Sequence, residues 1–332
     1  MRKPGLHPVL LAAFCLAFAL AASAQTLLVV NQGDADVSLI NPASGRQIAT
    51  LAENLPGVHG HEIAASPDGH TAFLPIYGSS GVGLPGIDGH QILVIDLPSR
   101  KIVGHIDFGH GVRPHLPLID PSSGLLYVTT ELSNSVAVID PKTRKIIGSI
   151  PTGQPQSHML AISHDGKRGY TANVGPGTVS ALDLVRRKTI AVIPVSGKVQ
   201  RISISADDKL VFTSDQTRPQ LVVIDTANDK VAARVTLPGL GYGTAATRNG
   251  RWLLVAIPST NQVAVVDLKT MRVVRNIHVP AAPQEILIRP DGKMAYVSCA
   301  GSRQVAAINL AQWKVTKSFT AGNYPDGLAW AR

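Results

Sequence analysis

The chain has 332 residues, a formal net charge of +9 and two cysteines. Cys15 lies in an apolar amino-terminal segment, so a chain without that segment keeps only Cys299 and can form no internal disulfide bond. The absence of a C-x-x-C-H motif excludes a covalently attached c-type haem. A chain of this length buries enough apolar surface to fold without a disulfide bond.

The first 24 residues are typical of a secretory signal peptide. Arg2 and Lys3 form a basic start, an apolar run continues to Ala22, and Ala22-Ser23-Ala24 is a cleavage site of small residues. The run is too short to span a membrane comfortably, and no later segment reads as a membrane helix. We therefore predict cleavage after Ala24 and a mature chain, without a transmembrane segment, in the periplasm or outside the cell.

A strand-like phrase that ends in aspartate or asparagine recurs along the rest of the chain. Its last residue is Asn41, Asp96, Asp140, Asp183, Asp225, Asp267 or Asn309. The intervals are 55, 44, 43, 42, 42 and 42 residues, and a glycine-rich insert at residues 78–90 explains the first. Turn signals such as Pro67-Asp68-Gly69 precede the second strand of most units, because Asp-Gly tolerates positive φ. Four short strands in about 42 residues are one propeller blade.

The first and last strands of the mature chain are predicted to belong to one blade. The chain begins with Leu27 to Val30, the second strand of a blade, and ends with Pro325 to Trp330, a first strand. Pairing them makes a seventh blade and removes an open sheet edge. The sequence thus predicts an all-β fold: one seven-bladed β-propeller of four-stranded blades over residues 25–332, closed by pairing of the amino- and carboxy-terminal strands in one blade.

Short motifs after these turns resemble a known family. They are Tyr127-Val128-Thr129, Tyr170-Thr171-Ala172-Asn173 and Tyr296-Val297-Ser298. With the following segments, they resemble the YVTN-repeat seven-bladed β-propeller family, the YncE-like exported propellers, over essentially the whole mature chain. The resemblance implies the fold, and it implies several functions, because relatives include extracellular binding and surface proteins. More distant propellers carry copper or haem in respiratory reductases, or act as sugar lactonases.

The repeat predicts a ring of side chains where the inner strands begin, around the axial opening on the top face. Equivalent positions in successive blades hold His61, His115, His158, Gln200, Tyr242, Gln284 and Asp326. We predict a ligand-binding site at this top mouth. Its residues are His59, His61, Glu62, His90, His110, Arg113, His115, His158, Arg201, Tyr242, Glu285 and Asp326.

Three histidines in consecutive blades offer neutral nitrogen ligands for copper or zinc, so His61, His115 and His158 are a candidate metal site. No compact motif such as H-E-x-x-H accompanies them. The same opening can hold the acid–base groups of a lactonase-like hydrolase, although no G-x-S-x-G motif is present. We expect a non-catalytic binding or scaffold protein for an unidentified protein or small molecule. A metal-binding or redox-associated propeller and a hydrolase are the alternatives.

Cations concentrate in the turns that the topology places on the bottom face, as in Arg186-Arg187-Lys188. Such a face attracts nucleic acid or an anionic surface. The sequence shows no aromatic stacking platform beside these charges, so we expect a solubilising surface instead.

Overall fold

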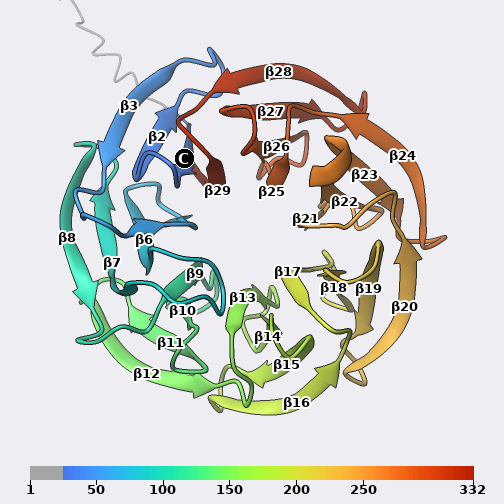
Figure 1. The fold of residues 1–332 in the computed structure, drawn as a ribbon, viewed down its shortest axis with the longest axis horizontal. Helices are drawn as coiled ribbons and strands as arrows, with labels where there is room; N and C mark the ends of the chain where they lie inside the picture. Colours follow the sequence, from blue (N-terminus) through green and yellow to red (C-terminus); the bar gives the residue numbers. More distant parts are fainter. Residues whose placement is uncertain (1–24) are drawn as a thin grey trace, which may run out of the picture.

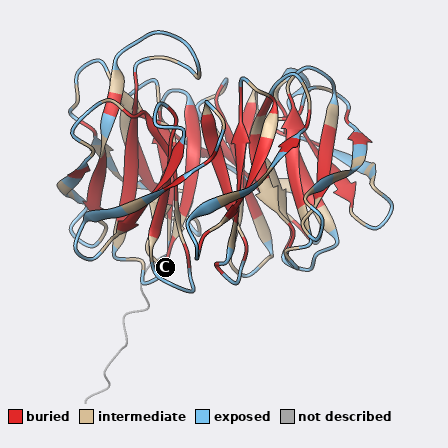
Figure 2. Cartoon of the chain, turned by 90° about the horizontal axis from the view of Figure 1, so that it is seen from below, coloured by how far each residue is buried: buried red, intermediate tan, exposed pale blue. Residues whose placement is uncertain are grey.

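The computed structural model describes residues 25–332, so the predicted signal peptide lies outside the described residues. Seven antiparallel sheets stand around a common axis, as Figure 1 shows from one end of that axis. In Figure 2, buried strands run between two faces of exposed loops. The prediction of an all-β, seven-bladed propeller is confirmed. Within residues 25–332, no helix is long and apolar enough to cross a membrane.

We number the blades from the one that closes the ring and give each from its inner to its outer strand. Blade 1 contains β29 (Pro325–Ala331), β1 (Thr26–Asn31), β2 (Asp36–Ile40) and β3 (Gln47–Ala52); blade 2 contains the two-part inner strand β4 (His59–Gly60) and β5 (Ala64–Ala65), then β6 (Thr71–Gly78), β7 (Asp88–Asp96) and β8 (Lys101–Asp107). Blade 3 contains β9 (Pro114–Ile119), β10 (Leu126–Thr130), β11 (Ser135–Asp140) and β12 (Lys145–Pro151); blade 4 contains β13 (Ser157–Ile162), β14 (Arg168–Asn173), β15 (Thr178–Asp183) and β16 (Lys188–Pro194). Blade 5 contains β17 (Val199–Ile204), β18 (Leu210–Asp215), β19 (Gln220–Asp225) and β20 (Lys230–Thr236); blade 6 contains β21 (Thr244–Ala246), β22 (Trp252–Ile257), β23 (Gln262–Asp267) and β24 (Arg272–His278), with the short 3-10 turn η1 (Pro258–Thr260). Blade 7 contains β25 (Pro283–Ile288), β26 (Met294–Cys299), β27 (Gln304–Asn309) and β28 (Lys314–Thr320).

Blade 1 joins segments from opposite ends of the chain. β29 pairs antiparallel with β1, and Thr26 lies opposite Ala331. Gly69 packs against the backbone of Arg332, where an added Cβ would approach the carbonyl oxygen to 2.1 Å, so only glycine fits there. The predicted closure is confirmed, and it leaves the inner strand of every blade paired.

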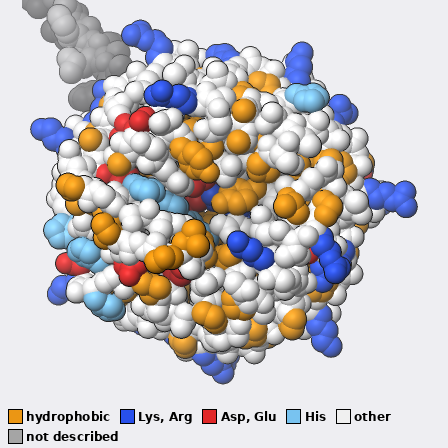
Figure 3. Space-filling view, in the orientation of Figure 1, with side chains coloured by type: hydrophobic (Ala, Val, Ile, Leu, Met, Phe, Trp, Pro, Cys, Tyr) orange, Lys and Arg blue, Asp and Glu red, His pale blue; other side chains and the backbone are white. Residues whose placement is uncertain are grey.

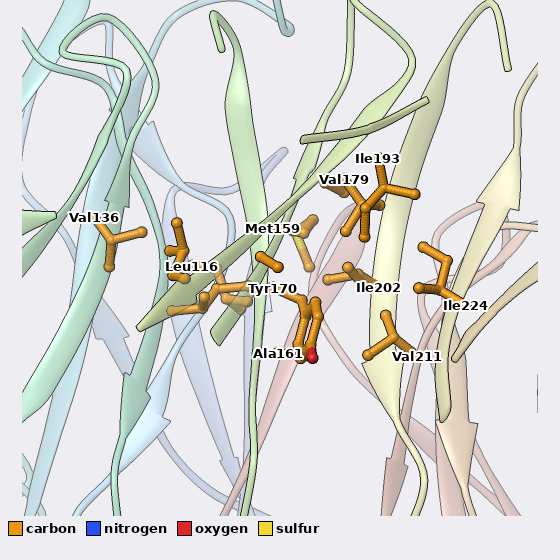
Figure 4. Close-up of a cluster of buried hydrophobic side chains, with 14 of the residues drawn as sticks. Leu116, Val136, Met159, Ala161, Tyr170, Val179, Ile193, Ile202, Val211 and Ile224 are labelled. Atoms are coloured by element: carbon orange, nitrogen blue, oxygen red, sulfur yellow. The ribbon is translucent and has the colours of Figure 1, made fainter. Parts of the chain in front are cut away.

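Apolar side chains fill the spaces between neighbouring blades. Figure 4 shows one such cluster, in which Tyr170 of blade 4 lies among Leu116 of blade 3 and Ile202 of blade 5. An aromatic side chain recurs at the Tyr170 position in most blades, always at most 4 % exposed: Phe73, Tyr127, Phe212 and Tyr296. These aromatic residues hold the blades together and leave the axis to other side chains.

The insert at residues 78–90 joins β6 to β7 and defines what we call the top face. Each inner strand begins on this face. The turns between the first and second strands, and between the third and fourth, lie on the opposite, bottom face.

In blades 2 to 7, a side chain in the bottom turn between the third and fourth strands reaches the preceding blade, whereas blade 1 has Gly45 at that position. The residue concerned always has positive φ: Gly45, Arg100, Arg144, Arg187, Asp229, Met271 or Trp313. In blades 2 to 4 it is an arginine that donates to a carbonyl of the preceding outer strand, at 3.4, 3.3 and 3.0 Å respectively. Blades 5 to 7 use Asp229, Met271 and Trp313 instead. We call these contacts inter-blade latches.

Candidate functional site

Three histidines from consecutive blades meet beside the axis. His61 precedes β5, His115 lies in β9 and His158 lies in β13. The ring centroids of His115 and His158 are 3.6 Å apart, and those of His61 and His115 are 5.3 Å apart. His115 and His158 are only 2 % and 3 % exposed. The repeat register therefore brings together side chains that are almost 100 residues apart in the sequence.

Each imidazole in this group keeps one buried nitrogen without a hydrogen-bond partner: His61 Nε2, His115 Nδ1 and His158 Nδ1. His158 Nδ1 lies 3.5 Å from Glu131 Oε2, which is too long for a good hydrogen bond. Burial, with neighbouring positive groups, lowers the pKa of all three histidines, so they are neutral near pH 7. Unpaired buried nitrogens are rare in folded proteins and indicate a place for a ligand or ordered water.

Arg201 of blade 5 reaches across the ring from the other side. Its guanidinium donates to Glu62 of blade 2 through Nη1 and to Asp326 of blade 1 through Nη2, the latter at 2.6 Å. All three side chains are buried. The Arg201 Nε–H has no hydrogen-bond partner. Tyr242 of blade 6 covers the guanidinium, with 5.1 Å between Arg201 Cζ and the ring centroid.

Glu285 brings blade 7 into the same network. Its carboxylate accepts a hydrogen bond from the Leu328 amide at 2.6 Å, and its side chain is also hydrogen-bonded to Glu62. Burial raises the pKa of Glu285 to about 7. Burial also holds the pKa of Glu62 well above its ordinary value, although Arg201 opposes that shift. The two carboxyl groups therefore share a proton near neutral pH.

Sequence reasoning did not single out two members of the site, Tyr77 and Glu131. The Tyr77 ring lies 4.8 to 5.6 Å from the rings of all three histidines, and its hydroxyl donates to Glu131. Burial alone would raise the pKa of Glu131, but His158 and Tyr77 lower it below its ordinary value. Two features of the sequence could have indicated them. Tyr77 lies near the end of the long strand β6, and Glu131 directly follows the fully buried strand β10.

The insert is bound to the rim beside these residues. Arg113 donates to the Leu84 carbonyl at 2.8 Å and to Asp88 at 2.6 Å, while the Gly83 amide donates to Glu131 at 3.1 Å. A cleft of ≈ 640 Å³ runs between the insert and the top of blades 3 and 4. The insert thus covers the Tyr77–Glu131 side of the site.

The other predicted site residues lie at different distances from this centre. His59 is half-buried and stacks on His61, with 5.1 Å between the rings. His90 and His110 lie outside the buried cluster: His90 pairs with Asp107 at 2.9 Å, and His110 is exposed. In Figure 3, histidine and acidic side chains lie together near the centre of the ring, and further histidines lie toward its edge.

Among residues 25–332, no group of three or more His, Cys, Asp or Glu side chains is arranged to hold one metal ion. At the axis, the His115 and His158 rings lie against each other, with 3.6 Å between their centroids and 31° between their planes. The nitrogens themselves suit copper or zinc. Metal binding by His61, His115 and His158 therefore stays a prediction that requires these rings to rotate.

Comparisons with known proteins agree with the architecture. Residues 234–331 match the family model of the YNCE-like β-propeller, and residues 121–248 match that of the cytochrome D1 heme domain. Among solved structures, the chain is similar to the hydrazine synthase of Kuenenia stuttgartiensis, with 20% sequence identity, a TM-score of 0.71 and coverage of 86% of this chain and 92% of that one. This likeness shows the fold alone. No curated protein matches the chain.

The second family match raises the question of haem at the axis. The rings of Tyr77 and the three histidines lie 3.6 to 5.6 Å from their neighbours, so side chains fill the space that a macrocycle would need. The residues present there do not fit a haem.

Proposed function

This chain has the YNCE-like β-propeller fold, and on that premise we propose that it is an exported, non-catalytic binding protein whose ligand occupies the axial cluster. One observation carries the proposal. Four buried nitrogens without partners, His61 Nε2, His115 Nδ1, His158 Nδ1 and Arg201 Nε, come from four consecutive blades around one axis. A ligand that bonds them would offset the cost of burying them, which is about 1–3 kcal/mol for each unsatisfied group.

The charges around the axis favour a neutral or cationic ligand. Arg201 is paired with Asp326, and burial raises the pKa of both Glu62 and Glu285, so at least one of these two carboxyl groups is neutral near pH 7. The histidines are neutral. A buried site with this balance disfavours a small anion. The ligand must also present an acceptor, because the Arg201 Nε–H can only donate.

Binding is favoured over hydrolysis because the carboxyl groups are already engaged. Glu62 and Asp326 accept from Arg201, and Glu285 accepts from a backbone amide. No cysteine or serine nucleophile accompanies them in the contacts described above. A lactonase-like activity would require one of these bonded groups to act as a free base.

A thermal-shift comparison tests the proposal. Polyols, monosaccharides, small amines and Zn²⁺ or Cu²⁺ form the test panel, and hydroxy acids form the anionic set. The matched proteins are the wild type, His115→Leu/His158→Leu, and His164→Leu/His278→Leu as a surface control. A true ligand at about 100 times its Kd stabilises the fold by about 2.7 kcal/mol.

We expect at least one neutral or cationic compound to raise the Tm of the wild type and of the surface control but not of the axial variant. Stabilisation by Zn²⁺ or Cu²⁺ alone, lost in the axial variant, would identify the site as a metal site. A panel that shifts all three proteins equally contradicts the proposal.

A further inference from the structure

A second candidate binding site lies on the bottom face, far from the axis in the fold. It is a cleft of ≈ 560 Å³ between blades 6 and 7. Its walls are the first bottom turns of both blades and the latch turn of blade 7. The volume falls in the range of about 300–1,000 Å³ that is usual for small-ligand sites.

Two tryptophans from different blades meet in this cleft. Trp252 begins β22 of blade 6, and Trp313 is the latch residue of blade 7. Their rings make an edge-to-face contact with 5.6 Å between centroids, and both side chains remain partly exposed. Two of the three tryptophans in the sequence therefore lie in this one cleft. At the position of Trp252, other blades have Arg168, Leu210 or Met294.

The polar groups at the mouth are mainly hydrogen-bond donors. Arg248 and Lys293 line the cleft, and their side chains make no ion pair within residues 25–332. The Asn309 oxygen is occupied by the Ala311 and Gln312 amides, which leaves its NH₂ group as the available donor. The one acidic residue, Asp291, is bound by Arg289 through two contacts of 2.8 and 2.6 Å. The cleft therefore presents two unpaired cations beside an indole surface.

We propose that this cleft binds a uronate residue of an acidic polysaccharide. The apolar face of a sugar ring packs on an indole, while its carboxylate and hydroxyl oxygens match the cations and amide donors. The secretory signal predicted at residues 1–24 would deliver the chain to compartments where such polysaccharides occur. This site is independent of the axial ligand, because no residue of the axial cluster lines it.

Intrinsic fluorescence tests this directly, since two of the three tryptophans line the cleft. The wild-type protein is titrated with trigalacturonate, with its trimethyl ester as the uncharged control and with a six-residue oligothymidylate as the nucleic-acid control. We expect saturable quenching by trigalacturonate and at least about tenfold weaker binding of the ester, because the ester lacks the charge-assisted contacts.

Three variants localise the effect. Arg248→Gln/Lys293→Gln alters only exposed side chains and should weaken trigalacturonate binding at least about tenfold. Trp313→Met copies the residue of the blade 6 latch, Met271, and should abolish binding. Trp330→Phe, which removes the tryptophan stacked on Tyr296, should bind as the wild type does.

Equal binding of acid and ester would overturn the proposal, as would unchanged binding by either cleft variant or the absence of saturation. Tighter binding of the oligothymidylate than of trigalacturonate would assign the cleft to nucleic acid and likewise overturn it.

Discussion

Blades 2 to 4 and blades 5 to 7 contribute to the same axial ring in opposite ways. The first group supplies His61, His115 and His158, which are buried with unpaired nitrogens. The second supplies Arg201 and Glu285, which are tied to Glu62, Asp326 and the backbone by charged hydrogen bonds. Two adjacent positions of one repeat have thus become two kinds of surface, because Arg201 and Glu285 each lie one residue after the position that the histidines occupy. The paired half, apart from the Arg201 Nε–H, holds the ring together, and the unpaired half remains available to a ligand.

The strongest test of this contrast is Arg201→Met. The substitution leaves Glu62 and Asp326 buried without their cation, so we expect the free energy of unfolding to fall by about 3–5 kcal/mol. Urea denaturation followed by circular dichroism measures it. The control is Arg186→Met, which removes an exposed pair with Asp183 and should change stability by at most about 0.5 kcal/mol. Equal effects of the two substitutions would remove the distinction between the halves.

A pH series tests the shared proton. The pKa of Glu285 is raised to about 7 in the folded chain, from an ordinary value of 4.5. Its contribution to stability is therefore complete below pH 4.5 and is lost as the pH rises through about 7. Between pH 5 and 7.5 the loss should be about 2 kcal/mol.

Glu285→Gln should flatten this pH dependence while Asp165→Asn leaves it unchanged, because the pKa of Asp165 is lowered to about 2 by Ser163 and lies outside the window. Glu53, whose pKa burial raises to about 7, contributes a remaining slope of the same sign. Denaturation at each pH measures the effect. A slope identical in the wild type and Glu285→Gln would show that the proton is held elsewhere.

The unpaired half should tolerate an apolar replacement. We expect His115→Leu to change the free energy of unfolding by less than about 1 kcal/mol, because removing an unpaired buried nitrogen offsets the loss of the imidazole's hydrogen bond to the His158 backbone. The neighbouring Thr129→Val removes a hydroxyl that bonds the Leu116 amide and the His158 carbonyl, and it should cost about 1–3 kcal/mol. A larger loss for His115→Leu than for Thr129→Val, measured by urea denaturation, would mean that the histidine nitrogen is satisfied in solution.

Substitutions in the inter-blade latches should change the free energy of unfolding least. Arg144→Ala removes one exposed hydrogen bond to the Val103 carbonyl and should cost about 0.5 kcal/mol or less. Met271→Ala removes apolar contact between blades 5 and 6 and should cost about 1 kcal/mol. If thermal melts place the two in the reverse order, the arginine latches hold blades 2 to 4 more strongly than their exposure indicates.

The sequence predicted the parts of this molecule that follow from repetition. The spacing of Asp96, Asp140 and their equivalents gave the blades, and the same register placed His61, His115 and His158 around the axis. Features outside the repeat did not follow from this spacing. Tyr77 enters the site because β6 extends toward the insert, and no periodicity marks it.

Which side chains form hydrogen bonds with one another could not be predicted from the sequence either. That Arg201 bonds Glu62 and Asp326 while the histidines stay unpaired depends on which rotamers fit across the axis. The meeting of Trp252 with Trp313 depends on the angle between two blades. The expectation that no aromatic platform accompanies the cations of the bottom face was therefore wrong, since both tryptophans lie in one cleft with Arg248 and Lys293.

The pairing of β29 with β1 also sets an order of events when the protein is made. Residues of one sheet, from Thr26 to Ala331, are separated by nearly the whole described chain. Until β29 pairs with β1, β1 has an unpaired edge and blade 1 is incomplete. Closing so long a loop is entropically costly and makes contacts between distant residues slow to form. The ring must therefore be completed last, by a segment of only seven residues.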